Sequence, residues 1–102
     1  MSKINFKIDS YEITEPGKLI ISGQKLPPPS KRITLHQKNI KIISANIIYK
    51  HKKGSIDCEV TRINQVKSFG EIRLHTSSIL YPGSYELTVQ YSGELDENAL
   101  MN

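Results

Sequence analysis

The chain has 102 residues, of which 37% are hydrophobic and 24% are charged, a composition typical of one small globular domain and not of a disordered segment. Fourteen Lys and Arg residues against ten Asp and Glu residues leave a net charge of +4, which is too small an excess to indicate a nucleic-acid partner. Cys58 is the single cysteine, so neither an internal disulfide nor a four-cysteine zinc site can form, and a reducing cytoplasm is the expected compartment.

The opening residues, MSKINFKIDSY, alternate polar with apolar side chains, whereas a secretory signal needs an unbroken apolar stretch. No later window of the sequence is long and apolar enough to span a bilayer. We therefore expect a soluble, cytoplasmic chain with no membrane partner.

Apolar residues recur at every second position in stretch after stretch, and each stretch is bounded by Gly, Pro, Ser or Asn. This pattern predicts an all-β fold and is typical of a sandwich or a barrel. Of the two we expect an antiparallel β-sandwich with saddle-like sheets of about seven to eight strands. We expect a single domain over residues 1–102. Within it, a Pro-rich connector at 24–31 should leave the sheet, because Pro27-Pro28-Pro29 cannot donate ladder hydrogen bonds.

The first strand and its turn follow from local chemistry. Apolar residues alternate over residues 4–8 and then, in the opposite phase, over 11–13, which predicts a β-bulge near Ser10. Pro16-Gly17 has the order that a type II turn requires. Residues 19–21 should then return as the second arm of a hairpin.

Four further strands are expected after the connector, at residues 32–36, 41–51, 56–63 and 71–75. Each strand forms one wall of a core, and the alternation of apolar and polar residues along it predicts which side chains face inward. These side chains are Ile43, Ala45, Ile47, Tyr49, Ile56, Cys58, Val60, Ile72 and Leu74. On the other side of the 41–51 strand, Ile42 and Ile48 predict that both of its faces are partly buried.

The last strand, Ser84 to Leu95, has the most regular alternation in the chain. Pro82-Gly83 repeats the Pro-Gly turn chemistry directly before it. The side chains expected to face inward are Tyr85, Leu87, Val89 and Tyr91. The polar tail from Asp96 either begins a helical turn or frays.

The sequence gives little indication of a metal site or of a nucleophilic residue. His36, His51 and His75 are far apart in the sequence, and each is expected at the end of a strand, so they do not indicate a metal site. Cys58 lies between two acidic residues that raise a thiol pKa, which favours a buried structural thiol over a nucleophile.

The charged clusters are explained without a ligand. Lys50-His51-Lys52-Lys53 precedes Gly54-Ser55 and is typical of a solvated hairpin end. The acidic group Glu94, Asp96 and Glu97 is typical of a solvated chain end or of the first turn of a helix. No catalytic, cofactor-binding or metal-binding residue is predicted, and the residues alone indicate a β-sandwich that binds or positions something rather than an enzyme.

The order of motifs from residue 30 to 101, and more loosely from 6 to 23, resembles the N-terminal domain of zinc aminopeptidases of the aminopeptidase N family. Those domains have a strand ending in Leu-His, an Ile-rich strand, a Pro-Gly, a Tyr-Leu-Thr strand and a Gly-x-Leu ending. Asp96 and Leu100 stand where the family approaches a Gly-Phe-Tyr-x-Ser segment. The matching residues are Ile33, Leu35, His36, Ile40, Ile42, Ile43, Pro82, Gly83, Tyr85, Leu87, Thr88, Tyr91, Gly93 and Leu95.

The resemblance implies a noncatalytic N-terminal β-domain of a zinc aminopeptidase. The family's His-Glu-x-x-His zinc helix and its Gly-x-Met-Glu-Asn strand are absent from this sequence, so zinc and peptide substrates would belong to the rest of the parent enzyme. The implied partner is the catalytic domain of the same polypeptide, with this domain helping to shape access to the active site. Since the family's domain is longer, exposed sheet edges and self-association are also expected.

Two other functions compete with this one. A free-standing adhesion or carbohydrate-binding sandwich would need a patch of exposed aromatic residues, but most of the five Tyr fall on inward positions. A nucleic-acid binder would use Lys50, Lys52 and Lys53, a smaller basic patch than phosphate binding usually requires.

Overall fold

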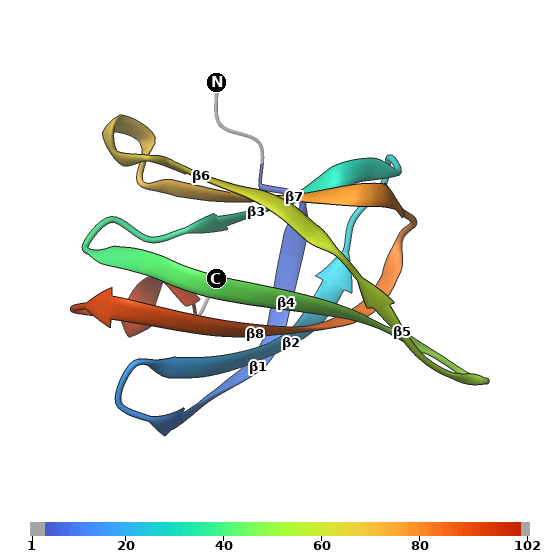
Figure 1. The fold of residues 1–102 in the computed structure, drawn as a ribbon, viewed down its shortest axis with the longest axis horizontal. Coiled ribbons are helices and arrows are strands. Elements are labelled where there is room, and N and C mark those ends of the chain that lie inside the picture. The colour runs from blue at the N-terminus through green and yellow to red at the C-terminus, as the bar shows by residue number, and fades with distance from the viewer. Residues whose placement is uncertain (1–3, 101–102) are drawn as a thin grey trace.

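The computed structural model describes residues 4–100, which form eight strands and two short 3₁₀ turns. All strand pairings are antiparallel, and they build a large sheet in the order β1-β2-β8-β4-β5 and a small sheet in the order β3-β7-β6 (Figure 1). The predicted all-β sandwich is confirmed. The elements are β1 (Phe6–Glu15), β2 (Lys18–Lys25), β3 (Ser30–His36), β4 (Ile40–His51), β5 (Gly54–Cys58), β6 (Val60–Val66), η1 (Lys67–Phe69), β7 (Glu71–Leu80), β8 (Gly83–Gly93) and η2 (Glu97–Leu100).

Strand β8 is the centre of the large sheet, because β2 and β4 pair with its two edges. Its predicted inward residues are all buried, and Leu87 has no exposed surface. They pack against Ile33, Ile72 and Leu74 of the small sheet, which are 0–1% exposed. Burial of each such side chain contributes on the order of 1.5–3 kcal/mol, so the contact between these residues of the two sheets stabilises the sandwich substantially.

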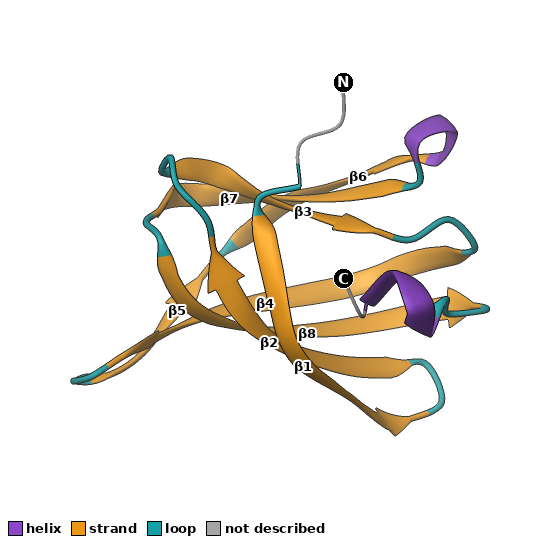
Figure 2. Cartoon of the chain, turned by 180° about the vertical axis from the view of Figure 1, so that it is seen from behind, coloured by secondary structure: helices purple, strands orange, loops and turns teal. Residues whose placement is uncertain are grey.

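The predicted hairpin at Pro16-Gly17 is confirmed, with Glu15 opposite Lys18 and Gly17 at φ 84°. The predicted bulge is confirmed as well, since the register passes from Ile8 to Ser10 and leaves one residue unpaired. This bulge lets β1 bend, and Figures 1 and 2 show β1 descending from the level of the small sheet to the edge of the large one.

A second bulge, in β4, was not predicted. The pairing with β8 passes from Ile42 to Ser44, so Ile43 is left out of the register and is 63% exposed. The prediction that Ile43 faces the core is therefore wrong, whereas Ile42 is buried. Beyond the bulge the phase is reversed, and Ile47 is buried as predicted.

The strand predicted at residues 56–63 is two strands in different sheets. β5 pairs with β4, β6 pairs with β7, and the chain crosses between the sheets at Glu59. Ile56, predicted to face inward, is 53% exposed, because β5 extends past the facing sheet as one arm of a projecting hairpin (Figure 1). Cys58, at the crossing, is buried.

Two proline segments differ from their predictions. Pro82-Gly83 joins β7 to β8, which lie in different sheets, and Gly83 has a φ of 155° against 84° at Gly17, so the Pro16-Gly17 turn geometry is not repeated there. The connector predicted at 24–31 is shorter and spans only 26–29, because residues 24 and 25 pair with β8. The buried Lys25 ammonium donates to the carbonyl oxygens of Leu26 and Pro28, each at 2.8 Å, and so ties the connector to β2.

The two sheets meet along two seams, each bridged by one side-chain amide. At the β1–β3 seam, the Asn5 backbone oxygen accepts the Leu26 N–H while its side chain donates to Arg32 O at 2.7 Å and accepts from Thr34 N at 3.0 Å. Asn5 therefore has its backbone in the large sheet and its side chain on the edge of the small sheet. Its amide takes the place of a peptide group of a neighbouring strand.

At the β4–β6 seam the roles of the sheets are exchanged, because Gln65 belongs to the small sheet and its side chain bonds the edge of the large sheet. Its backbone pairs with β7 of the small sheet, and its side chain accepts from Ile42 N and donates to Ile40 O, both at 2.9 Å. This part of β4 has no strand on that edge, because β5 begins to pair only at Ile47. Gln65 thus satisfies a stretch of sheet edge that would otherwise lack hydrogen-bond partners.

Replacing Gln65 with Ala should destabilise the protein by about 1–3 kcal/mol, because Ile42 N–H and Ile40 C=O both lose their partner. Denaturant unfolding of wild type and variant measures the change. The matched control is Gln90→Ala, which removes one exposed hydrogen bond to Ser44 and should change stability by less than about 0.5 kcal/mol. Equal effects of the two substitutions would contradict a special role for the seam amide.

Candidate functional site

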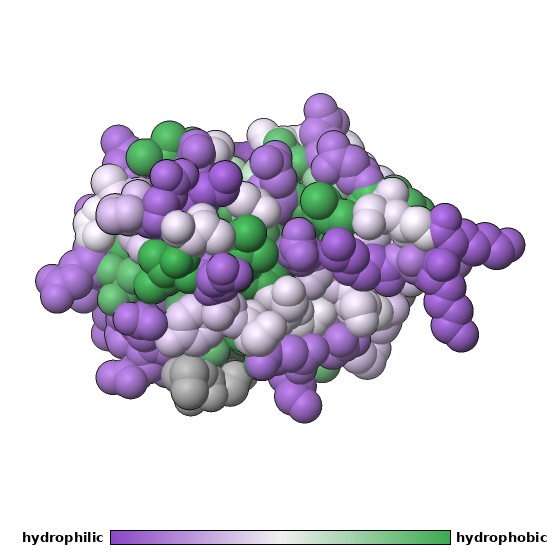
Figure 3. Space-filling model, turned by 90° about the horizontal axis from the view of Figure 1, so that it is seen from below, coloured by the Kyte–Doolittle hydropathy of each residue, from purple (hydrophilic) through white to green (hydrophobic). Residues whose placement is uncertain are grey.

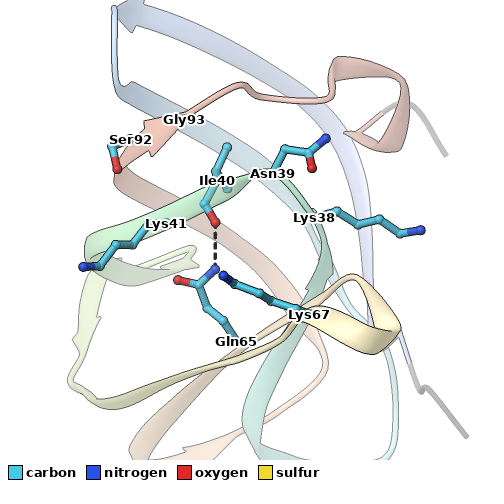
Figure 4. A pocket seen from close by; sticks show the side chains of 8 residues that line it. All are labelled: Lys38, Asn39, Ile40, Lys41, Gln65, Lys67, Ser92 and Gly93. Carbon is cyan, nitrogen blue, oxygen red and sulfur yellow. Dashed lines mark hydrogen bonds between the residues drawn. The ribbon is translucent and has the colours of Figure 1, made fainter.

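A broad hollow lies at the end of the sandwich where the β4–β6 seam opens. It has a volume of about 750 Å³, and its walls come from the β3–β4 connection, the start of β4, the end of β6, the start of η1 and the end of β8 (Figure 4). We call it the basic hollow. Its lining residues are Lys38, Asn39, Ile40, Lys41, Gln65, Lys67, Ser92 and Gly93.

Three exposed lysines form the rim of the basic hollow. Figure 4 shows the Lys67 ammonium directed toward Gln65 in the middle, with Lys38 and Lys41 extending to opposite sides. Their ammonium groups are thus spread in a row and do not converge on one point. Such a row suits several negative charges along a segment better than it suits one small ion.

The basic hollow carries no negative charge. No carboxylate is among its lining residues, and no salt bridge within residues 4–100 includes Lys38, Lys41 or Lys67. The polar side chain at its floor, Gln65, already has both amide groups bonded to β4. The charge that the hollow offers to a ligand is therefore positive, and Asn39 and Ser92 add neutral hydrogen-bonding side chains.

The walls of the basic hollow are held by close backbone contacts. Gly93 ends β8 at φ 101°, and a Cβ there would lie 2.4 Å from Asn39 O. This approach allows the Glu94 N–H to donate to Asn39 O at 3.1 Å. A Cβ at Gly70 would lie 2.8 Å from the Lys38 side chain, so the Lys38 stem packs directly on the backbone after η1.

A second hollow of about 440 Å³ adjoins the first and shares Asn39 with it. We call it the acidic hollow, because it is lined by the residues from Glu94 to Asn98, including all three carboxylates of the acidic group. The helical turn that was one of two predicted outcomes for this tail is present as η2. Leu100 of η2 is buried, while the three carboxylates are exposed.

Hydrogen bonds fix the acidic segment in place. The buried Gln37 donates to Asp96 O at 2.7 Å and accepts from Asp96 N at 3.0 Å, a third case of a side-chain amide bonded to a peptide group. Tyr11 donates its hydroxyl proton to Glu97 at 2.8 Å, a bond that raises the pKa of Tyr11. The Asp96 carboxylate accepts from Asn98 N at 3.1 Å and so begins η2.

The three histidines lie on separate elements. His36 ends β3 and His51 ends β4, as predicted, but His75 lies in the middle of β7, because that strand continues to Leu80. His75 sits opposite Arg32 of β3 and Arg62 of β6. Among residues 4–100, no group of three or more His, Cys, Asp or Glu side chains is placed to hold a metal ion.

Cys58 is a buried thiol, as predicted. Burial is the main cause that raises the pKa of the thiol, the charge of Asp57 raises it further, and a hydrogen bond from the Tyr49 backbone acts in the opposite direction. Its Sγ lies 3.7 Å from Ile56 O. These surroundings disfavour the thiolate and with it nucleophilic chemistry.

The basic cluster at 50–53 forms the end of the β4–β5 hairpin, where His51 pairs with Gly54. All of its residues are exposed, and Figure 3 shows the hairpin as a hydrophilic arm that extends from one end of the molecule. The predicted solvated hairpin end is confirmed. Lys50 alone has an acidic partner, Glu86 at 3.8 Å.

Neither a protein-family model nor a curated protein matches this chain significantly. Within the described part, no helix has the length and apolar character that crossing a membrane requires. The lysines of the basic hollow and the seam amides were missed by sequence reasoning. They are isolated polar residues on strand ends and connections, where no periodic signal marks them.

His75 should titrate below its usual pKa of 6.5, because burial and then the charges of Arg62, Arg32 and Arg73 disfavour the imidazolium. Below 6.5 the unfolded chain therefore binds more protons at this residue than the native chain, so stability falls as the pH drops through that window. NMR titration of the ring measures the midpoint, and Arg62→Gln should raise it. A midpoint at or above 6.5 would contradict the assigned environment.

Proposed function

We propose that this chain is a noncatalytic β-domain that packs beside the catalytic domain of a zinc aminopeptidase and helps to shape access to its active site. Zinc and peptide substrates then belong to the parent enzyme and not to this sandwich. A cytoplasmic location is part of the same proposal, in keeping with one buried, unpaired cysteine.

The observation that carries the proposal is the order of the family-like motifs, which lie on β3 and β4 and then at the β7–β8 crossing and on β8. His36 ends β3, the Ile-rich run opens β4, Pro82-Gly83 forms the crossing, and Gly93 ends β8 at its contact with Asn39. In this fold each motif has a structural task, which is to end a strand, start a strand or cross between sheets. The motif residues together favour one sandwich topology, and this supports the proposal that the chain has the same domain as the N-terminal part of the aminopeptidases.

Exposed apolar side chains offer a neighbouring domain small, separate contacts. The face in Figure 3 carries apolar spots among polar side chains and not one continuous apolar surface, in keeping with the more polar interfaces between domains of one chain. Of the five Tyr, Tyr81 alone is classed as exposed, at 60%, so the described residues offer no patch of aromatic rings for carbohydrate. The large exposed apolar residues are Ile4, Ile13, Leu26, Ile43, Ile56, Phe69, Ile79 and Tyr81.

The purified chain should not hydrolyse aminoacyl-p-nitroanilides, either with or without added zinc, because it lacks the zinc-binding helix motif. Release of nitroaniline, measured against an authentic aminopeptidase as positive control, checks this. Zinc-dependent turnover that stays with the protein through purification would overturn the noncatalytic assignment.

The genomic reading frame tests the parent directly. Sequence downstream of the codon for Asn102 should continue into Gly-Phe-Tyr-x-Ser, then Gly-x-Met-Glu-Asn, then His-Glu-x-x-His. A stop codon at that point, with no such motifs in a neighbouring frame, would contradict the aminopeptidase assignment and leave a free-standing module.

A further inference from the structure

The basic and acidic hollows lie side by side at the same end of the sandwich, with Asn39 in the wall of both. We propose that they are the two halves of a self-complementary interface, in which the basic hollow of one copy of this chain receives the acidic segment Glu94–Glu97 of a second copy. This inference goes beyond the proposed function and does not depend on it.

The opposite charges are close neighbours, yet they do not neutralise each other within one molecule. No salt bridge in residues 4–100 joins Lys38, Lys41 or Lys67 to a carboxylate of the acidic segment. The reason lies in how the segment is held. Gln37 bonds both backbone groups of Asp96, and Tyr11 bonds the Glu97 carboxylate on the side of β1, so the segment cannot fold back over the lysines.

The shapes agree with the charges. The three ammonium groups are spread across the basic hollow (Figure 4), and the acidic segment carries its three carboxylates within four consecutive residues. An extended run of cations is matched by an extended run of anions. Because Gln37 and Tyr11 already order the segment, docking it needs little further loss of conformational freedom.

A two-fold arrangement follows from the adjacency of the hollows. A symmetry axis that passes beside Asn39 sets each basic hollow against the acidic segment of the other copy, so both contacts form at once. Both contacts of each copy are then used within the dimer, so the assembly stops at two copies. This surface is distinct from the sheet edges, which are β1 and β5 in the large sheet and β3 and β6 in the small one. The sequence led us to expect self-association through exposed edges.

The chain offers a matched control. The tip of the β4–β5 hairpin carries Lys50, Lys52 and Lys53, the same number of lysines as the basic hollow, but on a projecting arm that lines neither the basic nor the acidic hollow. If association came only from nonspecific attraction between lysines and acidic residues, the lysines of the hairpin tip could supply it as well as those of the basic hollow. Docking into the basic hollow requires Lys38, Lys41 and Lys67 in particular.

Sedimentation velocity over a range of protein concentrations at low ionic strength tests the proposal. Wild type should show a monomer–dimer equilibrium whose association constant falls about tenfold or more at high salt, since exposed charge pairs are screened. The variant K38E/K41E/K67E should be monomeric, and so should E94K/E97K. The hairpin variant K50E/K52E/K53E should associate as wild type does.

The decisive sample is an equimolar mixture of K38E/K41E/K67E and E94K/E97K. In a mixed dimer the reversed hollow of the first variant meets the reversed segment of the second, and the other contact joins the two unaltered halves. Both contacts are then complementary, so the mixture should associate although each variant alone does not. Recovery in the mixture also shows that both variants are folded, which circular dichroism checks independently. A monomeric wild type, a hairpin variant as defective as the hollow variant, or a mixture that stays monomeric would each overturn the proposal.

Discussion

The sandwich depends on one recurring interaction, a side-chain amide that bonds the N–H and the C=O of a neighbouring backbone. Two sheets that close on each other bring unpaired strand edges together at their seams, and each buried backbone group left unsatisfied costs about 1–3 kcal/mol. Asn5 and Gln65 each satisfy one such edge from the opposite sheet. Gln37 applies the same chemistry to the segment after β8 and so positions η2 against β1.

The seams also determine where the candidate site lies. Gln65 closes the β4–β6 seam at Ile40 and Ile42, and the basic hollow opens next to this closure. Lys67 follows Gln65 by two residues and is carried into the hollow by the turn of η1. The charge of the site is thus set by surface lysines, whereas its shape is set by the amide bridge beneath them.

Much of the fold could be predicted from local pattern, and the failures have a common cause. The alternation in β8 and the Pro16-Gly17 turn depend on neighbouring residues only, and both are confirmed. The exposure of Ile43 and the crossing at Glu59 depend on which strand lies alongside, which an alternating pattern does not encode. Apolar and polar residues alternate without interruption over residues 56–63, although the chain changes sheets within them. The pattern is therefore the one expected of a single strand.

The candidate site was less predictable for the same reason. The acidic segment was recognised as a charged chain end, but its position beside three lysines arises because the β3–β4 connection and the end of β8 meet at Gly93. Asn5 and Gln65 carry no sequence signal that separates them from any other polar residue between strands. Their role depends on two backbone groups that are distant in the sequence.

Hydrogen exchange at Ile42 N–H and Thr34 N–H tests the seam bridges most directly, because each of these groups has a side-chain amide as its partner. Both should exchange slowly in the native protein, and Gln65→Ala should abolish the protection of Ile42 while leaving that of Thr34. Fast exchange of Ile42 in the wild type, or unchanged protection in the variant, would contradict closure of the sandwich by side-chain amides.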